Sequence, residues 1–246
     1  MRPAGASRAA AHRYTVRACA LGGLRLELGG VEIVCRPSGA LWLESAGALI
    51  VADLHLEKGS SYAVRGQMLP PFDTADTLSR LEAETAVLRP RVLVFLGDSL
   101  HDRTAEERLS ASDAQRLRAL AAGRTLIWLA GNHDEEAPRS LPGETAGSIC
   151  LEGLDLVHEP ASGPVSAEAA GHLHPCARVR GRGASVRRRC FVTDGERIVL
   201  PAFGAFAGGL NVRDSAFRAL FRRPPLAAVL GLAAVHPVPW AALGGD

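Results

Sequence analysis

Metal-binding side chains recur in five short segments of the sequence, and each segment follows a run of residues typical of a strand. In chain order the candidate ligands are Asp53, His55, Asp98, Asn132, His158, His172 and His174. Together they offer carboxylate, imidazole and amide donors but no thiolate. Such a donor set favours hard to borderline divalent cations such as Mn²⁺, Fe²⁺ or Zn²⁺.

Seven ligands are more than one ion needs, so the pattern indicates a pair of ions. Two ions about 3.5–4 Å apart can share a carboxylate, activate a water as nucleophile and hold the oxygens of a phosphoryl group. Asp98 comes from the middle of the first three segments and is the candidate bridge. We expect Asp53-x-His55 and His172-x-His174 to be extended, which would place both members of each pair on one side and let each pair chelate.

Each of these residues also has an ordinary structural interpretation. Asp53 and Asp98 could cap helices, Asn132 could belong to a turn, and His158 could be a hydrogen-bonded core histidine. Taken singly, the structural interpretation is favoured each time. Five of the eight histidines of the chain fall in these segments, however, and this clustering favours a functional site.

The elements that must position these side chains alternate between strand and helix. Apolar strands are predicted at 48–52, 92–96 and 125–130, with helices at 73–88 and 111–122. The carboxyl ends of parallel strands meet at one edge of a sheet, where ligands bind. The flanking parts read as β-structure, with a hairpin at 24–28 and 31–35 and later strands at 154–157, 168–170, 188–193 and 198–201.

The ordered string Asp-x-His, Gly-Asp-x-x, Gly-Asn-His-Asp, isolated His and Gly-His-x-His runs from Asp53 to His174. It resembles the signature of the calcineurin-like metallophosphoesterase superfamily. The resemblance implies a metal-dependent phosphoesterase of the α/β class with a four-layer α-β-β-α sandwich. That fold agrees with the strand and helix alternation and with the β-rich second half.

The resemblance also implies a role for each ligand. Asp53, His55 and His174 would hold one ion, Asn132, His158 and His172 would hold the second, and Asp98 would bridge them. His133 would contact the phosphate and protonate the leaving oxygen, with Asp134 orienting its ring. Many members carry a carboxylate shortly after Gly-Asp, where this chain has His101 and then Asp102, so the roles of these two residues stay open.

Five further segments carry a narrower resemblance, to the ligase-associated DNA damage response endonucleases. They are Lys58-Gly59-Ser60-Ser61-Tyr62, the segments 69–74 and 97–102, Pro201-Ala202-Phe203-Gly204, and Gly208-Gly209-Leu210-Asn211. This family implies an Mn²⁺-dependent phosphodiesterase or endonuclease that acts on DNA, single-stranded or with structured ends, in DNA repair. A DNA ligase and a helicase are the partners it implies.

Two other functions remain open at this point. A small-molecule phosphoesterase acting on cyclic nucleotides or dinucleotides would use the same metal chemistry. A non-catalytic scaffold of the same fold is disfavoured because every ligand position is filled.

Arginines crowd the stretch after Gly-His-x-His, and Arg178, Arg180 and Arg182 could hold the phosphates of a polyanion. A solvated loop explains them equally well, because all but one of the 28 basic residues of the chain are arginine. The aromatic candidates for stacking on bases are Phe191, Phe203 and Phe206.

The bulk composition sets the remaining expectations. A net charge of +2 is too mild to indicate nucleic-acid binding by itself, and five widely spaced cysteines without a CxxC pair favour a reducing cytoplasm. No apolar run is long enough to span a membrane. We expect a disordered extension at 1–20, one domain at 21–222 and a C-terminal tail of uncertain structure at 223–246.

Overall fold

The first of two β-sheets carries the early candidate ligands. The computed structural model describes residues 14–67, 69–134, 138–180 and 185–245. Within these residues the first sheet has eight strands, and each pairs with the next along the chain. They are β1 Val16–Ala18, β2 Leu24–Leu28, β3 Val31–Cys35, β4 Leu41–Leu43, β5 Ala48–Val51, β6 Val92–Leu96, β7 Thr125–Leu129 and β8 Glu144–Ala146. Strands β1 to β5 are antiparallel and β5 to β8 are parallel, so β5, β6 and β7 end at the same edge.

The second sheet has ten strands within the described residues, and its pairing no longer follows chain order. They are β9 Ser148–Leu151, β10 Leu154–Val157, β11 Glu168–Ala170, β12 Pro175–Arg180, β13 Ser185–Thr193, β14 Arg197–Val199, β15 Leu210–Asn211, β16 Leu226–Leu230, β17 Val235–Pro239 and β18 Leu243–Gly244. Strand β13 is long enough to pair with β12 near its start and with β14 and β16 near its end. Its first half therefore forms a two-stranded ribbon with β12.

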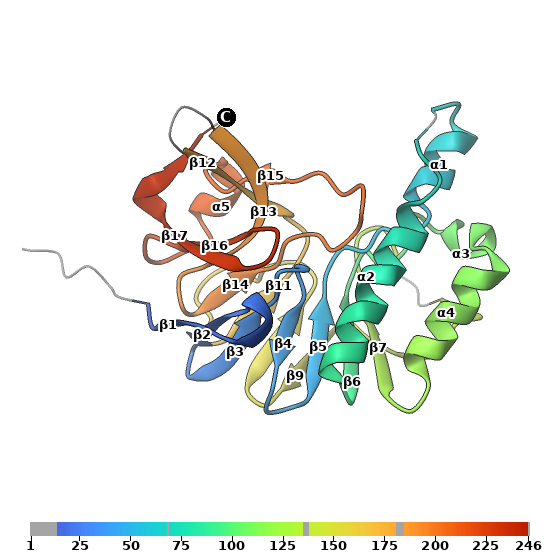
Figure 1. Ribbon diagram of the computed structural model, residues 1–246, viewed down its shortest axis with the longest axis horizontal. Coiled ribbons are helices and arrows are strands. Elements are labelled where there is room, and N and C mark those ends of the chain that lie inside the picture. The colour runs from blue at the N-terminus through green and yellow to red at the C-terminus, as the bar shows by residue number, and fades with distance from the viewer. Residues whose placement is uncertain (1–13, 68, 135–137, 181–184, 246) are drawn as a thin grey trace, which may run out of the picture.

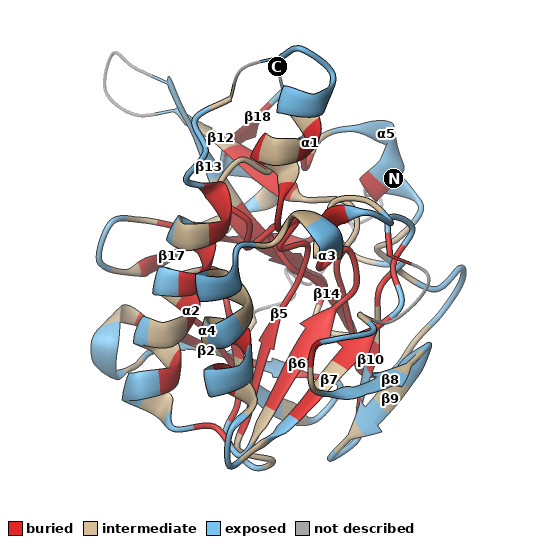
Figure 2. Ribbon diagram, turned by 90° about the vertical axis from the view of Figure 1, so that its right-hand side faces the viewer, coloured by how far each residue is buried: buried red, intermediate tan, exposed pale blue. Residues whose placement is uncertain are grey.

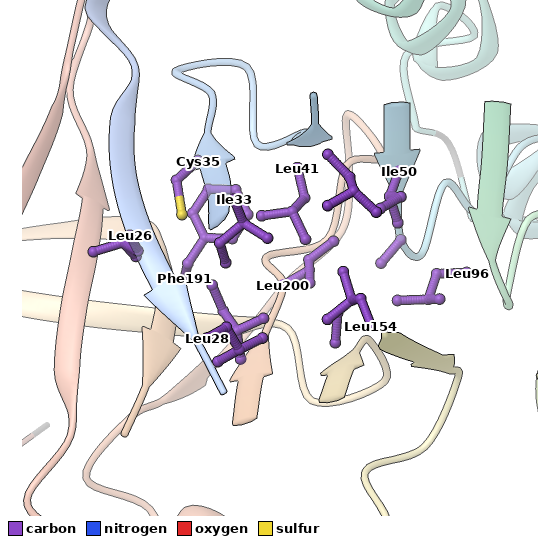
Figure 3. Packing of buried hydrophobic residues seen from close by; sticks show 14 of the residues in the cluster. Leu26, Leu28, Ile33, Cys35, Leu41, Ile50, Leu96, Leu154, Phe191 and Leu200 are labelled. Carbon is purple, nitrogen blue, oxygen red and sulfur yellow. The ribbon is translucent and has the colours of Figure 1, made fainter. Parts of the chain in front are cut away.

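The two sheets face each other across an apolar core (Figure 3). One cluster contains fully buried side chains from both sheets. The first sheet contributes Ile50 and Leu96, and the second contributes Leu154, Phe191 and Leu200, the residue after β14. Burial of such side chains stabilises the fold by about 1.5–3 kcal/mol each. The core fixes the distance between the sheets, and so the distance between ligands that come from each of them.

Helices cover the outer face of the first sheet (Figure 1). On this side lie α1 Lys58–Val64, α2 Asp73–Leu88, α3 Ala105–Arg108 and α4 Ala111–Ala121. The other helices of the described residues are α5 Ser215–Arg218 and the short 3-10 helices η1 Ala20–Gly22 and η2 Trp240–Ala242. Leu78 of α2 and Leu117 of α4 pack in one cluster with Phe95 of β6. Figure 2 shows the buried strands β5 and β6 beside α2 and α4, which carry exposed residues on the side away from the strands.

The predicted four-layer α-β-β-α order is confirmed, with a small fourth layer. Phe217 of α5 packs with Ala177 and Val199 on the outer face of the second sheet. Helix α5 has four residues, and the rest of that face is covered by η2 and nearby loops that bring in Trp240 and Leu220. The predicted hairpin, the helices at 73–88 and 111–122, and the strands between them are also confirmed.

The predicted boundaries of the domain are too narrow at the N-terminal end. Strand β1 pairs with β2, although residues 14–20 were assigned to a disordered extension; residues 1–13 lie outside the described part of the chain. At the C-terminal end, β16 and β17 extend the second sheet next to β13. Within the described residues, no helix is both long enough and apolar enough to cross a bilayer.

Candidate metal centre

The loops after β5 and β6 lie side by side at the carboxyl edge of the first sheet. The amide of Asp53 donates to the carbonyl of Gly97 at 3.2 Å, and the amide of His55 donates to the carbonyl of Asp98 at 2.9 Å. Because the strands are parallel and in register, their continuing loops stay paired beyond the sheet. This pairing brings Asp53, His55 and Asp98 into one small region.

Five of the candidate ligands adopt a left-handed backbone conformation. The φ angles are 53° for Asp53, 45° for His55, 46° for Asp98, 68° for His172 and 46° for His174. The prediction of extended Asp-x-His and His-x-His segments is therefore wrong. A non-glycine residue costs about 1–2 kcal/mol in this conformation, and such strain is found mainly at functional sites.

One group of ligand atoms consists of Asp53, His55 and His174, which all lie within 4.8 Å of one another. The Nε2 atoms of His55 and His174 are 3.3 Å apart, and His174 Nε2 lies 3.3 Å from Asp53 Oδ1. Asp53 also accepts a hydrogen bond of 3.0 Å from the amide of His172. The structure therefore joins a loop of the first sheet to the loop before β12 of the second.

A second group consists of Asp98, His158 and His172. His158 Nε2 lies 3.5 Å from Asp98 Oδ2 and 3.0 Å from Asn132 Oδ1, while its Nδ1 lies 3.0 Å from the carbonyl of Leu96. His172 and His174 belong to different groups, so the prediction that they chelate as a pair is wrong. The family resemblance likewise assigns His174 to one ion and His158 and His172 to the other, and that assignment stays a prediction.

Gly97 makes room for the second group. Its φ is 74°, and a Cβ atom at this position would lie 2.3 Å from Nδ1 of His158. The His158 ring therefore occupies the space that any side chain at 97 would need. The glycine of the Gly-Asp motif is a packing requirement of the site.

His133 lies at the exposed side of these groups. One of its ring nitrogens is within 4.8 Å of ligand atoms of His55 and Asp98, and its amide donates to Asp98 Oδ1 at 2.9 Å. Its Nδ1 lies 3.0 Å from the carbonyl of His101. Because a carbonyl oxygen only accepts, Nδ1 donates this hydrogen bond, and Nε2 is the ring nitrogen left for the site.

Asp134 has a different task from the predicted one. Its Oδ2 accepts hydrogen bonds from the amides of Ser99 at 2.7 Å and Leu100 at 3.1 Å, and the ring of His133 is oriented by the His101 carbonyl instead. Burial raises the pKa of Asp134 to about 6, although the hydrogen bonds from the two amides act in the opposite direction and lower it. Asp134 thus holds the loop that carries Asp98.

Replacing Asp134 with alanine should therefore destabilise this loop. It leaves two buried amides without their acceptor, so the free energy of unfolding in urea should fall by about 1–3 kcal/mol. Ser99→Ala is the matched control, because the buried Ser99 hydroxyl has no hydrogen-bond partner within the described residues. Equal unfolding free energies for Asp134→Ala and the parent protein would refute this role.

The model of the calcineurin-like phosphoesterase family matches residues 48–175, just over half of the chain. The chain belongs to this family. The matched region contains all seven candidate ligands together with His133 and Asp134. The protein is accordingly a metal-dependent phosphoesterase, as the sequence predicts.

The chain is also similar to solved structures. It is similar to the nuclease MPE of Pseudomonas putida, with 30% identity over 88% of this chain and 100% of that one, and a TM-score of 0.70. It is also similar to Yfce, a phosphoesterase from E. coli, with 16% identity over 78% of this chain and 98% of that one, and a TM-score of 0.39. No curated protein sequence matches it.

The residues present fit the divalent ions that the calcineurin-like family implies. Burial opposes ionisation of Asp98, but hydrogen bonds from His158 and from the His133 amide outweigh it and hold its pKa below the usual range. Burial, followed by the nearby charge of His174, lowers the pKa of His55 to about 3, so this imidazole stays neutral. Its buried Nδ1 has no hydrogen-bond partner in the described part of the chain. A charged Asp98 beside a neutral His55 matches the protonation states that a bound divalent cation requires. Burial opposes protonation of His158, but its hydrogen bond to Asp98 and the charge of Asp53 raise its pKa to about 9, so this imidazole has to release a proton when an ion binds.

His101 is a residue of the site whose role the sequence left open. Its ring stacks on His133 with a centroid distance of 5.5 Å and an interplanar angle of 18°, and Tyr62 of α1 lies 6.0 Å beyond it. Burial lowers the pKa of His101 to about 4, so it meets His133 as a neutral ring. Asp102 faces away and binds Arg108 at 2.7 Å. His101 thus occupies the place where many family members carry a carboxylate.

The three arginines predicted to contact substrate follow His174 along and beyond β12. Arg178 is half-buried and Arg180 is exposed, and both lie in β12; Arg182 lies outside the described residues. Phe191 and Phe203 are fully buried, so they do not offer a face to a base. Of the predicted stacking residues, Phe206 alone retains partial exposure.

Proposed function

We propose that this enzyme is an Mn²⁺-dependent phosphodiesterase and endonuclease that cleaves DNA, single-stranded or at structured ends, in DNA repair. The observation that carries the proposal is the similarity to a nuclease over the full length of that protein, at 30% identity. A cytoplasmic location follows from a DNA substrate and agrees with five cysteines that form no disulfide in the described part of the chain. The ligase-associated resemblance adds a DNA ligase and a helicase as partners.

The ligand groups support a diester substrate through their position. Two divalent ions bound by these groups would activate a water and neutralise the oxygens of the phosphoryl group. His133 stands at the exposed side of the groups, where a leaving oxygen would depart, and its ring is oriented by the His101 carbonyl. A general acid held in this way can protonate an alkoxide, which is the poor leaving group of a DNA strand.

The test uses the purified protein stripped of metal and reloaded separately with Mn²⁺, Fe²⁺, Zn²⁺ or Mg²⁺. Circular single-stranded DNA, linear single strands, duplexes and flaps are assayed beside bis-p-nitrophenyl phosphate. We expect Mn²⁺ to support cleavage of the circular strand, which has no end and so reports endonucleolytic cuts.

The same assay separates the competing function. Hydrolysis of bis-p-nitrophenyl phosphate without cleavage of any DNA, and without competition by DNA, would overturn the nuclease proposal. It would leave a phosphoesterase for small diesters such as cyclic nucleotides or dinucleotides. Highest activity with another ion would overturn the Mn²⁺ assignment alone.

A further inference from the structure

Four arginines lie on one face of the ribbon formed by β12 and the first half of β13. In the antiparallel register Arg178 is directly opposite Arg187, and Cys176 is directly opposite Arg189. Residues directly opposite each other point to the same face, and alternate residues along a strand do so as well. The face therefore carries Arg178, Arg180, Arg187 and Arg189.

This face is the inner one, which is turned toward the first sheet and the metal centre. Phe191 follows Arg187 and Arg189 in the same alternation, and it is buried in the core between the sheets. Arg188 alternates with them and lies opposite Ala177, whose side chain is in the cluster on the outer face. Arg189 on this face donates to the carbonyls of Ala202 and Gly204, and the amide of Gly204 donates to the carbonyl of Asp53, so the face reaches the ligand loops.

The charges on this face have no acidic partner. Like charges directly opposite each other destabilise an antiparallel pair, and Arg178 and Arg187 are such a pair. Arg178 donates to the Ser185 hydroxyl at 2.7 Å, Arg187 to the carbonyl of Gly209 and Arg189 to the carbonyl of Ala202. Among the described residues, no carboxylate forms an ion pair with any of the four. A guanidinium has five donors, so most remain available for an anion.

The spacing selects the kind of anion. Arg178 lies four residues beyond His174 along the extended strand, and Arg180 lies six residues beyond it. At the rise of a β-strand these separations correspond to about 13 Å and about 20 Å from His174. A small diester bound at the ligands is too short to contact these arginines. A nucleic-acid strand that passes through the metal centre is long enough to place phosphates beside them.

We infer that the inner face of the β12–β13 ribbon binds the phosphate backbone of the DNA strand on one side of the cleavage point. This inference rests on the proposed function. Contacts to phosphates position a strand but carry no base information, and the buried Phe191 and Phe203 cannot add stacking. The ribbon therefore gives affinity that depends on salt and does not depend on sequence.

The test compares two charge reversals on the same ribbon, Arg178→Glu on the inner face and Arg188→Glu on the outer face. Both change the net charge by the same amount, so the long-range field of the protein changes equally. The Kd of the Mn²⁺-loaded protein for a fluorescein-labelled phosphorothioate oligothymidylate is measured by anisotropy between 50 and 200 mM salt.

Arg178→Glu should raise Kd at least tenfold and lower the slope of log Kd against log salt by about 0.7 or more, the value for one phosphate contact on a single strand. Arg188→Glu should stay within about twofold of the parent protein. Melting temperature and metal content verify that each variant is folded. If Arg178→Glu does not fold, Arg180→Glu replaces it, because that side chain is exposed.

Equal losses of affinity in both variants would overturn the inference, since they would reflect net charge and not the ribbon. So would a parent protein that does not bind the oligonucleotide. Binding that depends on Arg178 without any DNA cleavage would instead leave the ribbon assignment standing and remove the nuclease proposal. The two proposals thus fail in different ways.

Discussion

Replacing Asp98 with asparagine is expected to lower kcat/KM for bis-p-nitrophenyl phosphate by about a thousandfold or more, which corresponds to about 4 kcal/mol. Asp98 belongs to two of the three ligand groups, as His55 does, and it is the carboxylate of these two residues. The amide keeps the shape of the side chain but removes its charge. Asparagine also tolerates a φ of 46°, so the backbone of the loop is expected to persist.

Metal analysis of Asp98→Asn should show the loss of at least one of two bound ions. Asp102→Asn is the matched control, because this carboxylate is four residues further along the same loop and binds Arg108. We expect the control to keep both ions. Unchanged metal content in Asp98→Asn would refute the assignment of Asp98 as the bridge.

Replacing His133 with alanine should lower kcat by about 10²–10⁴ on DNA, the range for loss of a general acid. The loss should be much smaller on bis-p-nitrophenyl phosphate, because p-nitrophenolate departs without needing a proton. Both ions should remain bound, since the assigned role of His133 is in proton transfer. The measurement is single-turnover cleavage of the two substrates, together with metal analysis of the same samples.

His236→Ala serves as the control for His133, because His236 is an exposed histidine of β17. Loss of a bound ion from His133→Ala would identify His133 as a metal ligand. The ligand atoms of His133, His55 and Asp98 lie close enough together to hold an ion in that case. Equal losses on both substrates would show that His133 positions the phosphate and does not protonate the leaving oxygen.

The parallel part of the first sheet could be predicted from the sequence because its signals are local. An apolar strand, an amphipathic helix and a closing Pro90 or Gly123 repeat along this part of the chain. The order of the second sheet could not be predicted, because β13 pairs with distant β16 as well as with its chain neighbours β12 and β14, and β11 pairs in parallel with β14. The apolar run at β16 is short and gives no indication of its partner.

The family resemblance predicts which ligands share an ion, whereas the residues alone do not predict the local backbone geometry of these ligands. The left-handed backbone at Asp53 and His174 depends on hydrogen bonds with loops of other strands, which a short segment does not encode. The contacts of Asp134 have the same origin. The grouping of the arginines on the inner face of the ribbon could not be predicted without the register of β12 against β13. This register places Arg178 opposite Arg187.

Two of the three groups of ligands take donors from both sheets. His55 belongs to a loop of the first sheet and His174 to a loop of the second, and they are 119 positions apart in the chain. Cations bound here would cross-link distant parts of the polypeptide, and closing so long a loop restricts the unfolded chain strongly. Depriving a cell of the ion would therefore shorten the lifetime of the protein, because the opened chain is the form that proteases degrade.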